Sequence, residues 1–242
     1  SDLLNEYVET GKLLGYKQLA LTDDGVLHGA VEFYERCIQN GIQPILGCTF
    51  EVAWKSDASR KEMLVVYAKG AKGYESLLKL STLYQQGLTW TKEMTEWIVT
   101  HSEDVKIVLP PMDSEWVAAH SKGRLEAVLG AVKEEYAGVE IAVGITREMV
   151  ERGEFDTMRE GIEAAGVIPV AFSVSRYLNT TDYFPWKVLQ AIRLGETLSF
   201  TQEDATGSES LPEATSMTKV FQAAVGGVLL SNLEQFTKDL VV

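Results

Sequence analysis

The chain has 242 residues, enough for one large domain with a well-buried core, and its 45% hydrophobic and 24% charged residues are ordinary for a soluble globular protein. The 22 Lys and Arg residues against 35 Asp and Glu give a net charge of -13, which would repel a phosphate backbone and argues against DNA binding by this chain alone. No apolar run approaches the roughly 20 residues of a membrane span, and the two cysteines indicate neither a disulfide framework nor a zinc site, so a cytoplasmic location is expected.

The first predicted strand, Gln18–Thr22, ends abruptly in a polar turn made of Asp23, Asp24 and Gly25. Side-chain oxygens at the carboxyl end of a strand lie where α/β proteins have their catalytic and ligand-binding residues. The plain alternative is that the two aspartates only form a turn and cap the next helix, since Asp favours both positions. The turn is therefore the first candidate for a functional site.

Five further strand-like runs follow, separated mostly by helical patterns. They are Gln43–Trp54, Met63–Ala68, Val105–Leu109, Val139–Val143 and Val167–Ser173. Between them, helical spacing relates Tyr74, Leu77, Leu78, Ser81 and Tyr84, and then Phe155, Met158, Ile162 and Ala165, which predicts two amphipathic helices with one buried stripe each. This β-α alternation predicts sequential parallel strands, either closed into a barrel or open as a doubly wound sheet.

The composition changes after residue 198. Residues 199–210 are polar and poor in apolar side chains, which indicates a loop or linker, and a last helix is predicted at about Glu213 to Val225. The expected division is a barrel domain over residues 1–200 and a linker with a helical segment over 201–242.

Three segments near the amino terminus carry a family resemblance, and Val105–Met112 and Pro169–Leu178 resemble later strands of the same family. The turn Leu21–Gly25, the helix start Gly29–Tyr34 and the strand start Pro44–Thr49 resemble the PHP (polymerase and histidinol phosphatase) domain at the amino terminus of bacterial DNA polymerase III alpha subunits. Members of that family show Leu-Thr-Asp-His-Gly, Gly-x-x-Glu-Phe-Tyr and Pro-Ile-x-Gly-Cys-Glu in these places. The resemblance implies a distorted seven-stranded β/α barrel, whose first strand, with a His-x-His motif, is expected upstream of Ser1.

The resemblance also implies a cluster of divalent metals at the carboxyl ends of the strands, from which this chain departs. The positions of the family's ligands are occupied here by Asp24 for a histidine, Thr49 for a glutamate, Met112 for a cysteine, Glu140 on a carboxylate position, Val174 for an aspartate and Arg176 for a histidine. A guanidinium about 4 Å from a divalent ion would cost on the order of 8 kcal/mol at an effective dielectric of 20. We therefore expect a degenerate site that binds no metal and has no catalytic residues, with Arg176 paired to Asp24 or Glu140.

With its metal site degenerate, a member of this family is expected to be a structural and docking domain. The parent protein would be a DNA-directed DNA polymerase that uses magnesium in a separate core, without an exonuclease inserted in this domain. The expected partners are that polymerase core and other replisome subunits, with DNA contacted through the parent protein and no membrane. The alternative is a weakly active metal-dependent phosphoesterase or 3′ to 5′ proofreading exonuclease that keeps one metal through Asp23, Asp24 and Glu140. A general α/β binding module is a third interpretation.

Overall fold

The computed structural model describes residues 2–53, 59, 61–112, 114–173 and 228–240. Six strands form one sheet in which the spatial order follows the chain order. They are β1 (Gln18–Leu21), β2 (Gln43–Ala53), β3 (Lys61–Ala68), β4 (Val105–Leu109), β5 (Glu140–Ile145) and β6 (Ile168–Ala171). Each strand begins and ends within two residues of its predicted bounds, so the apolar runs located the strands correctly.

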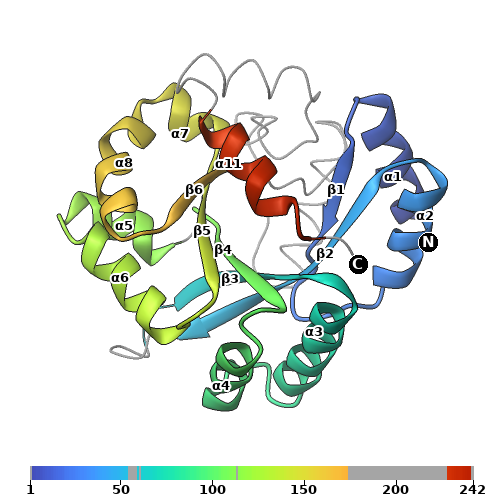
Figure 1. The fold of residues 1–242 in the computed structure, drawn as a ribbon, viewed down its shortest axis with the longest axis horizontal. Coiled ribbons are helices and arrows are strands. Elements are labelled where there is room, and N and C mark those ends of the chain that lie inside the picture. Colours follow the sequence, from blue (N-terminus) through green and yellow to red (C-terminus); the bar gives the residue numbers. More distant parts are fainter. Residues whose placement is uncertain (1, 54–58, 60, 113, 174–227, 241–242) are drawn as a thin grey trace, which may run out of the picture.

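The sheet curls into an incomplete barrel with helices around its outside (Figure 1). The helices are α1 (Asp2–Leu13), α2 (Ala30–Gln39), α3 (Gly70–Gln85), α4 (Lys92–Thr100), α5 (Glu115–Ser121), α6 (Leu125–Glu135), α7 (Arg147–Glu151), α8 (Glu154–Ala164) and α11 (Val228–Thr237). The α/β barrel fold expected from the family resemblance is confirmed in this open form, with six strands in the described part of the chain.

The expectation of parallel strands throughout is wrong at β3. This strand pairs antiparallel with both β2 and β4, whereas β1–β2, β4–β5 and β5–β6 are parallel. Only residues 54–60 separate β2 from β3, and a parallel connection needs a crossover of about a dozen residues or more. The short connection therefore forces the chain to turn back.

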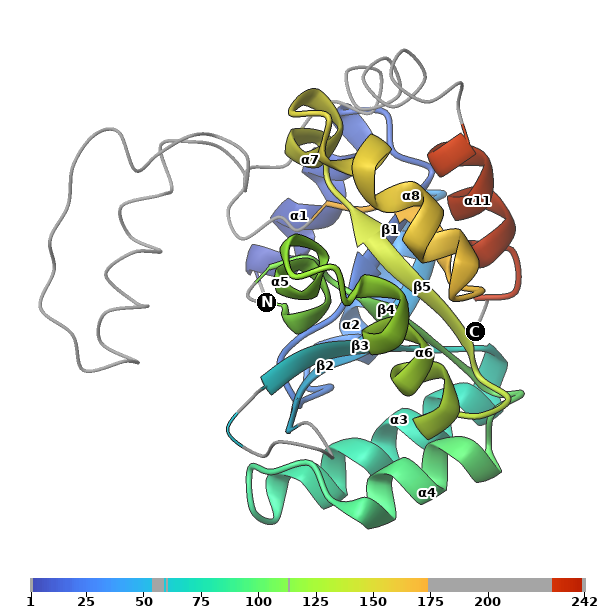
Figure 2. The same ribbon diagram turned by 90° about the vertical axis from the view of Figure 1, so that its left-hand side faces the viewer.

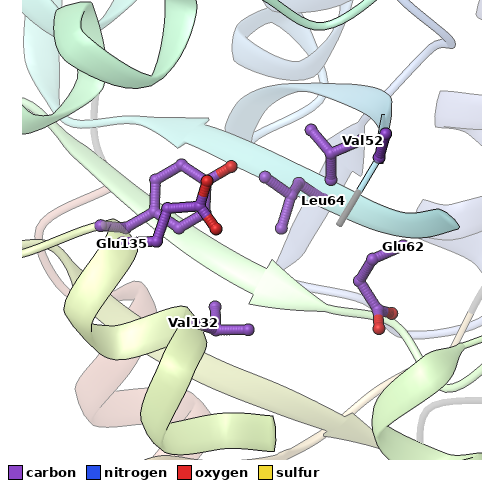
Figure 3. Close-up of a pocket in the computed structure, with 7 residues that line it drawn as sticks. Val52, Glu62, Leu64, Val132 and Glu135 are labelled. Atoms are coloured by element: carbon purple, nitrogen blue, oxygen red, sulfur yellow. The ribbon is translucent and has the colours of Figure 1, made fainter. Parts of the chain in front are cut away.

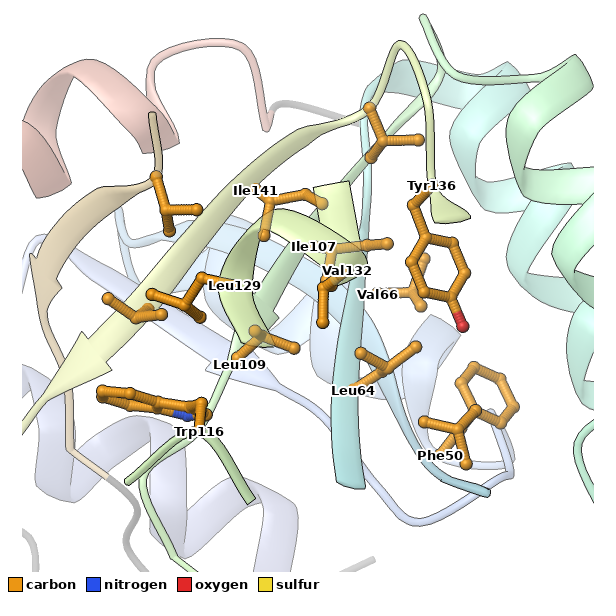
Figure 4. Close-up of a cluster of buried hydrophobic side chains, with 14 of the residues drawn as sticks. Phe50, Leu64, Val66, Ile107, Leu109, Trp116, Leu129, Val132, Tyr136 and Ile141 are labelled. Atoms are coloured by element: carbon orange, nitrogen blue, oxygen red, sulfur yellow. The ribbon is translucent and has the colours of Figure 1, made fainter. Parts of the chain in front are cut away.

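The larger core lies between the outer face of the sheet and the helices α3 to α8. Alternate residues of the strands, among them Leu64, Ile107 and Ile141, pack there against Trp116 and Leu129 (Figure 4). Phe155, Met158 and Ile162 of α8 are at most 1% exposed, as their spacing predicted.

The buried stripe of α3 differs from the predicted one by about one residue. Gly73, Ser76, Leu77, Leu80 and Leu83 are its buried members, while Leu78 is 43% exposed. Tyr74 and Tyr84 are half-buried at the margin of the core. The small residues Gly73 and Ser76 let the helix approach the sheet closely, which a count of large apolar residues cannot reveal.

The inner face of the curled sheet has its own small core. Ile45, Val65, Val108, Ala142 and Val170 come from five successive strands and meet Phe236 and Leu240. In Figures 1 and 2 α11 crosses the open side of the barrel beside β6. The Asn232 side chain donates to the Pro169 carbonyl of β6 at 2.9 Å, and the Thr237 hydroxyl lies 3.3 Å from the Gln18 amide oxygen of β1. This helix thus bridges the two edge strands.

The predicted polar linker and the predicted helix at Glu213 to Val225 lie outside the described residues, as does the proposed domain boundary at residue 200. Within the described part of the chain, no helix has both the length and the apolar character needed to cross a membrane.

Candidate functional site

The polar turn after β1 is attached to the neighbouring strand β2. The Thr49 N–H donates to the Asp23 carbonyl at 3.0 Å, and the Gly25 N–H donates to the Thr49 carbonyl at 2.8 Å. Asp24 and Thr49 form an isolated parallel bridge that continues the β1–β2 ladder. These bonds hold the two aspartates at the carboxyl end of β1, as the sequence predicted.

The same turn is also fixed from outside the sheet by α3. The Gly25 carbonyl accepts hydrogen bonds from the Ser81 hydroxyl at 2.7 Å and from the Gln85 side-chain amide at 3.0 Å. Gly25 has φ of +65°, and a Cβ there would lie 2.7 Å from the Tyr84 ring. Glycine is the residue that fits both the positive φ and the close approach of the Tyr84 ring, so the glycine of the motif has a structural cause.

The helix-capping interpretation of the aspartates does not hold. The residue that caps α2 is Gly29, which has no side chain to accept a hydrogen bond from the first turn of that helix. Asp23 and Asp24 are instead both exposed at the turn. Although part of its side chain is exposed, Asp23 loses some hydration at the turn, and this desolvation, together with the adjacent Asp24, raises its pKa, while His28 opposes the shift. The turn therefore presents two neighbouring carboxylates to solvent.

Thr49 and Cys48 are occupied by hydrogen bonds to the turn itself. The Thr49 hydroxyl donates to the Thr22 carbonyl at 2.8 Å. The Cys48 thiol is fully buried and lies 3.5 Å from the Asp23 carbonyl oxygen and 3.7 Å from that of Val26. Burial raises the pKa of this thiol to about 12, so it remains protonated at neutral pH. Both side chains serve the turn as donors.

Met112 lies between β4 and α5, beyond the carboxyl end of β4, and is half-buried. The alignment with the family predicted this strand-end position. A thioether is a soft and weak ligand for the hard divalent ions that oxygen sites bind.

Glu140 lies at the amino end of the sheet, away from the aspartate turn. It is the first residue of β5, and its carboxylate is 3.1 Å from Lys106 Nζ. Lys106 also donates to the Phe236 carbonyl at 2.7 Å, next to Thr237, which contacts the first residue of β1. Asp23 and Asp24 follow the other end of β1, so the fold does not bring Glu140 to them as a third ligand.

The remaining two family positions, Val174 and Arg176, lie outside the described residues, so pairing of Arg176 with Asp24 stays a prediction. Among the residues that the structure does describe, no group of three or more His, Cys, Asp or Glu side chains is arranged to hold a metal ion. At this end of the sheet the described residues therefore supply the carboxylates of Asp23 and Asp24, a threonine engaged with the backbone and a methionine.

Two charged residues that the sequence reasoning missed are buried in strands. Lys106 is 2% exposed on the inner face of β4, and Glu62 is 4% exposed on the outer face of β3. A charge inside an otherwise apolar strand run was the available signal, in Val105–Leu109 for Lys106 and beside Met63–Ala68 for Glu62. Their partners come from distant segments and could not be deduced from the local pattern.

A shallow pocket lies on the outer face of the sheet (Figure 3). Apolar side chains and two glutamates from the ends of β2 and β3 and from α6 line it, namely Val52, Ala53, Glu62, Leu64, Val132, Glu135 and Tyr136.

Comparison with known proteins matches residues 1–156 to the family model described as the PHP domain. The DNA polymerase III subunit alpha of Halalkalibacterium halodurans is 32% identical over 225 residues, which cover 89% of this chain and 19% of that protein. That of Bacillus subtilis is 29% identical over 225 residues, with 87% and 19% covered. The chain thus spans about a fifth of the length of these curated relatives.

Among solved structures, an amidohydrolase from Chromobacterium violaceum overlaps with a TM-score of 0.44 at 12% identity, over 70% of this chain and 81% of that one. This overlap is too small to indicate a shared function.

Proposed function

The chain belongs to the PHP domain family, and from this premise we propose that it is the PHP domain of a bacterial DNA polymerase III alpha subunit whose metal site has lost its ligands. In this proposal DNA synthesis with magnesium takes place in a separate polymerase core. The PHP domain has no hydrolase activity of its own. It is a scaffold that contacts the polymerase core and other replisome subunits.

The names of the relatives support the assignment to a polymerase. The matching proteins from Halalkalibacterium halodurans and Bacillus subtilis are both DNA polymerase III alpha subunits, and the matches extend over almost nine-tenths of this chain. The strongly acidic composition, with a net charge of -13, favours a role in which DNA is held by other parts of the parent protein.

The proposed loss of metal binding is supported by the side chains around the turn after β1, most of which are engaged in hydrogen bonds with the backbone. The Thr49 hydroxyl donates to the Thr22 carbonyl, and the Cys48 thiol is buried. The carboxylates of Asp23 and Asp24 are therefore the side chains of this turn that could coordinate a metal. A water-activating metal cluster in a hydrolase requires several ligands held in a fixed geometry. Two carboxylates on one exposed turn do not supply that geometry.

Metal analysis of the purified protein tests this proposal. We expect substoichiometric zinc, manganese and iron by plasma mass spectrometry, and no release of nucleotides from 3′-labelled single-stranded DNA in manganese or zinc. The Asp23→Asn, Asp24→Asn double variant is the matched control and should give the same values. Stoichiometric metal, or nuclease activity, that the double variant loses would instead establish the phosphoesterase or exonuclease alternative.

The polymerase assignment needs a separate test. The product of the complete natural reading frame should extend a primed template with deoxynucleoside triphosphates and magnesium, and the Asp23→Asn, Asp24→Asn double variant should extend it at the same rate. A complete product without primer extension would contradict the assignment and favour a PHP-fold binding module.

A further inference from the structure

Asn40 and Gly41 lie in the connection between α2 and β2 and form the only Asn-Gly pair of the sequence. The other asparagines precede Glu6, Thr180 and Leu233. In an Asn-Gly pair the glycine backbone nitrogen can attack the carbonyl carbon of the asparagine side chain, because glycine has no side chain to hinder the approach. The pair is therefore a candidate site of covalent modification by deamidation.

Deamidation requires only the chain and water. A bond forms between the Gly41 nitrogen and Asn40 Cγ, the bond from Cγ to the amide nitrogen Nδ2 breaks, and ammonia leaves with the proton that the Gly41 nitrogen loses. Water then opens the five-membered succinimide ring at either carbonyl carbon. The product is aspartate or isoaspartate, and in isoaspartate the main chain passes through Cβ and Cγ and is longer by a carbon atom.

The fold holds this pair in the cap at the end of α2. Gly41 has φ of +68°, and its N–H donates to the Ile38 carbonyl at 3.1 Å. The Ile42 N–H donates to the Cys37 carbonyl at 2.9 Å. Two such bonds around a left-handed glycine form a Schellman cap, which supplies donors for carbonyls that the helix leaves free. Ile42 is 3% exposed and packs in the same small hydrophobic core as Cys37, which anchors the cap.

The cap prevents ring closure in the folded chain. Asn40 has ψ of 5°, which places the Gly41 nitrogen nearly eclipsed with the backbone nitrogen of Asn40, whereas ring closure needs it on the side of Cβ. The reacting amide is also held, since Asn40 Nδ2 donates to the Arg36 carbonyl at 2.9 Å. The attacking nitrogen is engaged through its N–H with Ile38. Both reacting groups must leave these bonds before the ring can form.

We propose that Asn40 is a deamidation site that the folded cap of α2 protects and that local opening of this cap exposes. Opening of a helix end costs less free energy than global unfolding, so the rate of modification should follow the stability of the cap. The inference concerns the chemistry of the α2–β2 connection. It goes beyond the proposed scaffold function and does not depend on it.

Deamidation would weaken the cap irreversibly. The new carboxylate cannot donate to the Arg36 carbonyl, and it places a negative charge at the helix end where the dipole is already negative. The isoaspartate product also lengthens the main chain just before β2 begins at Gln43, whose N–H donates to the Lys17 carbonyl at 2.9 Å. The modification therefore acts on the connection that leads into the pairing of β2 with β1.

Peptide mapping by mass spectrometry, after incubation of the purified chain at neutral pH, tests the proposal. The mass gain from amide to acid should appear at Asn40 at least about tenfold more slowly in the folded protein than in the chain unfolded in guanidinium chloride. In the unfolded chain Asn40 should convert faster than the other asparagines. Isomerisation of Asp24 before Gly25 leaves the mass unchanged, so it cannot be mistaken for this reaction.

The variant Ile42→Ala loosens the cap without changing the reacting pair. It should speed the conversion of Asn40 in the folded protein and leave the rate in guanidinium chloride unchanged. The variant Asn40→Asp reproduces the aspartate product and should lower the melting temperature by about 2–4 °C. Its matched control is Gln39→Glu, which adds the same charge at an exposed neighbouring position without removing the donor to Arg36, and the control should lower the melting temperature less.

Three results would overturn the proposed site. They are a smaller difference in rate between the folded and the unfolded wild-type chain, faster conversion of another asparagine in the unfolded chain, or no acceleration in folded Ile42→Ala. If Ile42→Ala does not fold, the comparison of the folded and unfolded wild-type chains decides. Equal melting temperatures of Asn40→Asp and Gln39→Glu would contradict the weakening of the cap by the product.

Discussion

At the scale of single residues, close backbone contacts constrain this fold as strongly as its large side chains do. Gly73, in the first turn of α3, packs against the β3–β4 connection, where a Cβ would lie 2.4 Å from the Asp104 carbonyl oxygen and 2.9 Å from the Ala68 backbone. The Lys69 N–H donates to the same Asp104 carbonyl at 2.8 Å, so this oxygen cannot easily move away. Gly130, in the middle of α6, has no atom within 4 Å of its Cβ position.

These two glycines should respond in opposite ways to alanine. We expect Gly73→Ala to lower the free energy of unfolding by about 1–3 kcal/mol, since the backbone must shift to admit the methyl group. Gly130→Ala should raise it by about 0.5–1 kcal/mol, because glycine is a poor residue for a helix interior. Urea denaturation of both variants measures the difference. Equal effects of the two substitutions would show that α3 does not approach the sheet as closely as described.

The aspartate turn was predictable from the sequence because its determinants are local. An apolar run, two aspartates and a glycine specify a strand end and a tight turn within a few residues. Glu62 and Lys106 were not predictable, because their hydrogen bonds depend on segments far along the chain. Lys106 donates to a carbonyl 130 residues away, and Glu62 accepts from N–H groups more than 50 residues away.

At the scale of elements, the strands were predictable and their pairing was only partly so. Apolar runs located all six strands in the described part of the chain, since burial on both faces leaves a continuous apolar signature. The antiparallel direction of β3 was overlooked even though the short stretch between β2 and β3 signals it. The placement of α11 across the barrel depends on contacts with both β1 and β6, which no local pattern contains.

Lys106 connects this last helix to the sheet. Its ammonium group donates to the Phe236 carbonyl near the end of α11 and lies 4.8 Å from the centre of the Phe236 ring. It also lies 3.1 Å from a carboxylate oxygen of Glu140 and 3.7 Å from one of Asp239. A cation near the end of a helix also interacts favourably with the helix dipole. One buried side chain therefore combines several contacts that hold α11 in place.

Replacing Lys106 should loosen α11. We expect Lys106→Met, which keeps the apolar stem, to cost about 1–3 kcal/mol, because the buried Phe236 carbonyl loses a charged donor. Protease accessibility of residues 228–240 should increase in parallel with the loss measured by urea denaturation. The control is Lys92→Met, in which the removed ion pair with Glu96 is exposed, and it should leave both values unchanged. Equal behaviour of the two variants would contradict the role assigned to Lys106.

At the scale of the whole molecule, the dominant electrostatic property is the excess of negative charge. The net charge of -13 means that the folded chain repels itself, and the two carboxylates at the turn after β1 add to this locally. Dissolved salt weakens such repulsion, since the screening length falls from about 30 Å at 0.01 M to about 8 Å at 0.15 M ionic strength. A specific magnesium site would instead stabilise the fold by saturable binding.

Melting curves in two salts at matched ionic strength separate these effects. Sodium chloride added from about 0.01 M to 0.15 M ionic strength should raise the melting temperature by about 2–4 °C, which corresponds to about 1 kcal/mol for a domain of this size. If Asp23 and Asp24 hold no specific ion, magnesium chloride at equal ionic strength should add little to this rise. The Asp23→Asn, Asp24→Asn double variant should then show the same rise in both salts. An extra rise that saturates with magnesium and disappears in the double variant would reveal a metal site at the turn. That outcome would contradict the proposed loss of metal binding, because general screening depends on total charge and neither saturates nor requires these two residues.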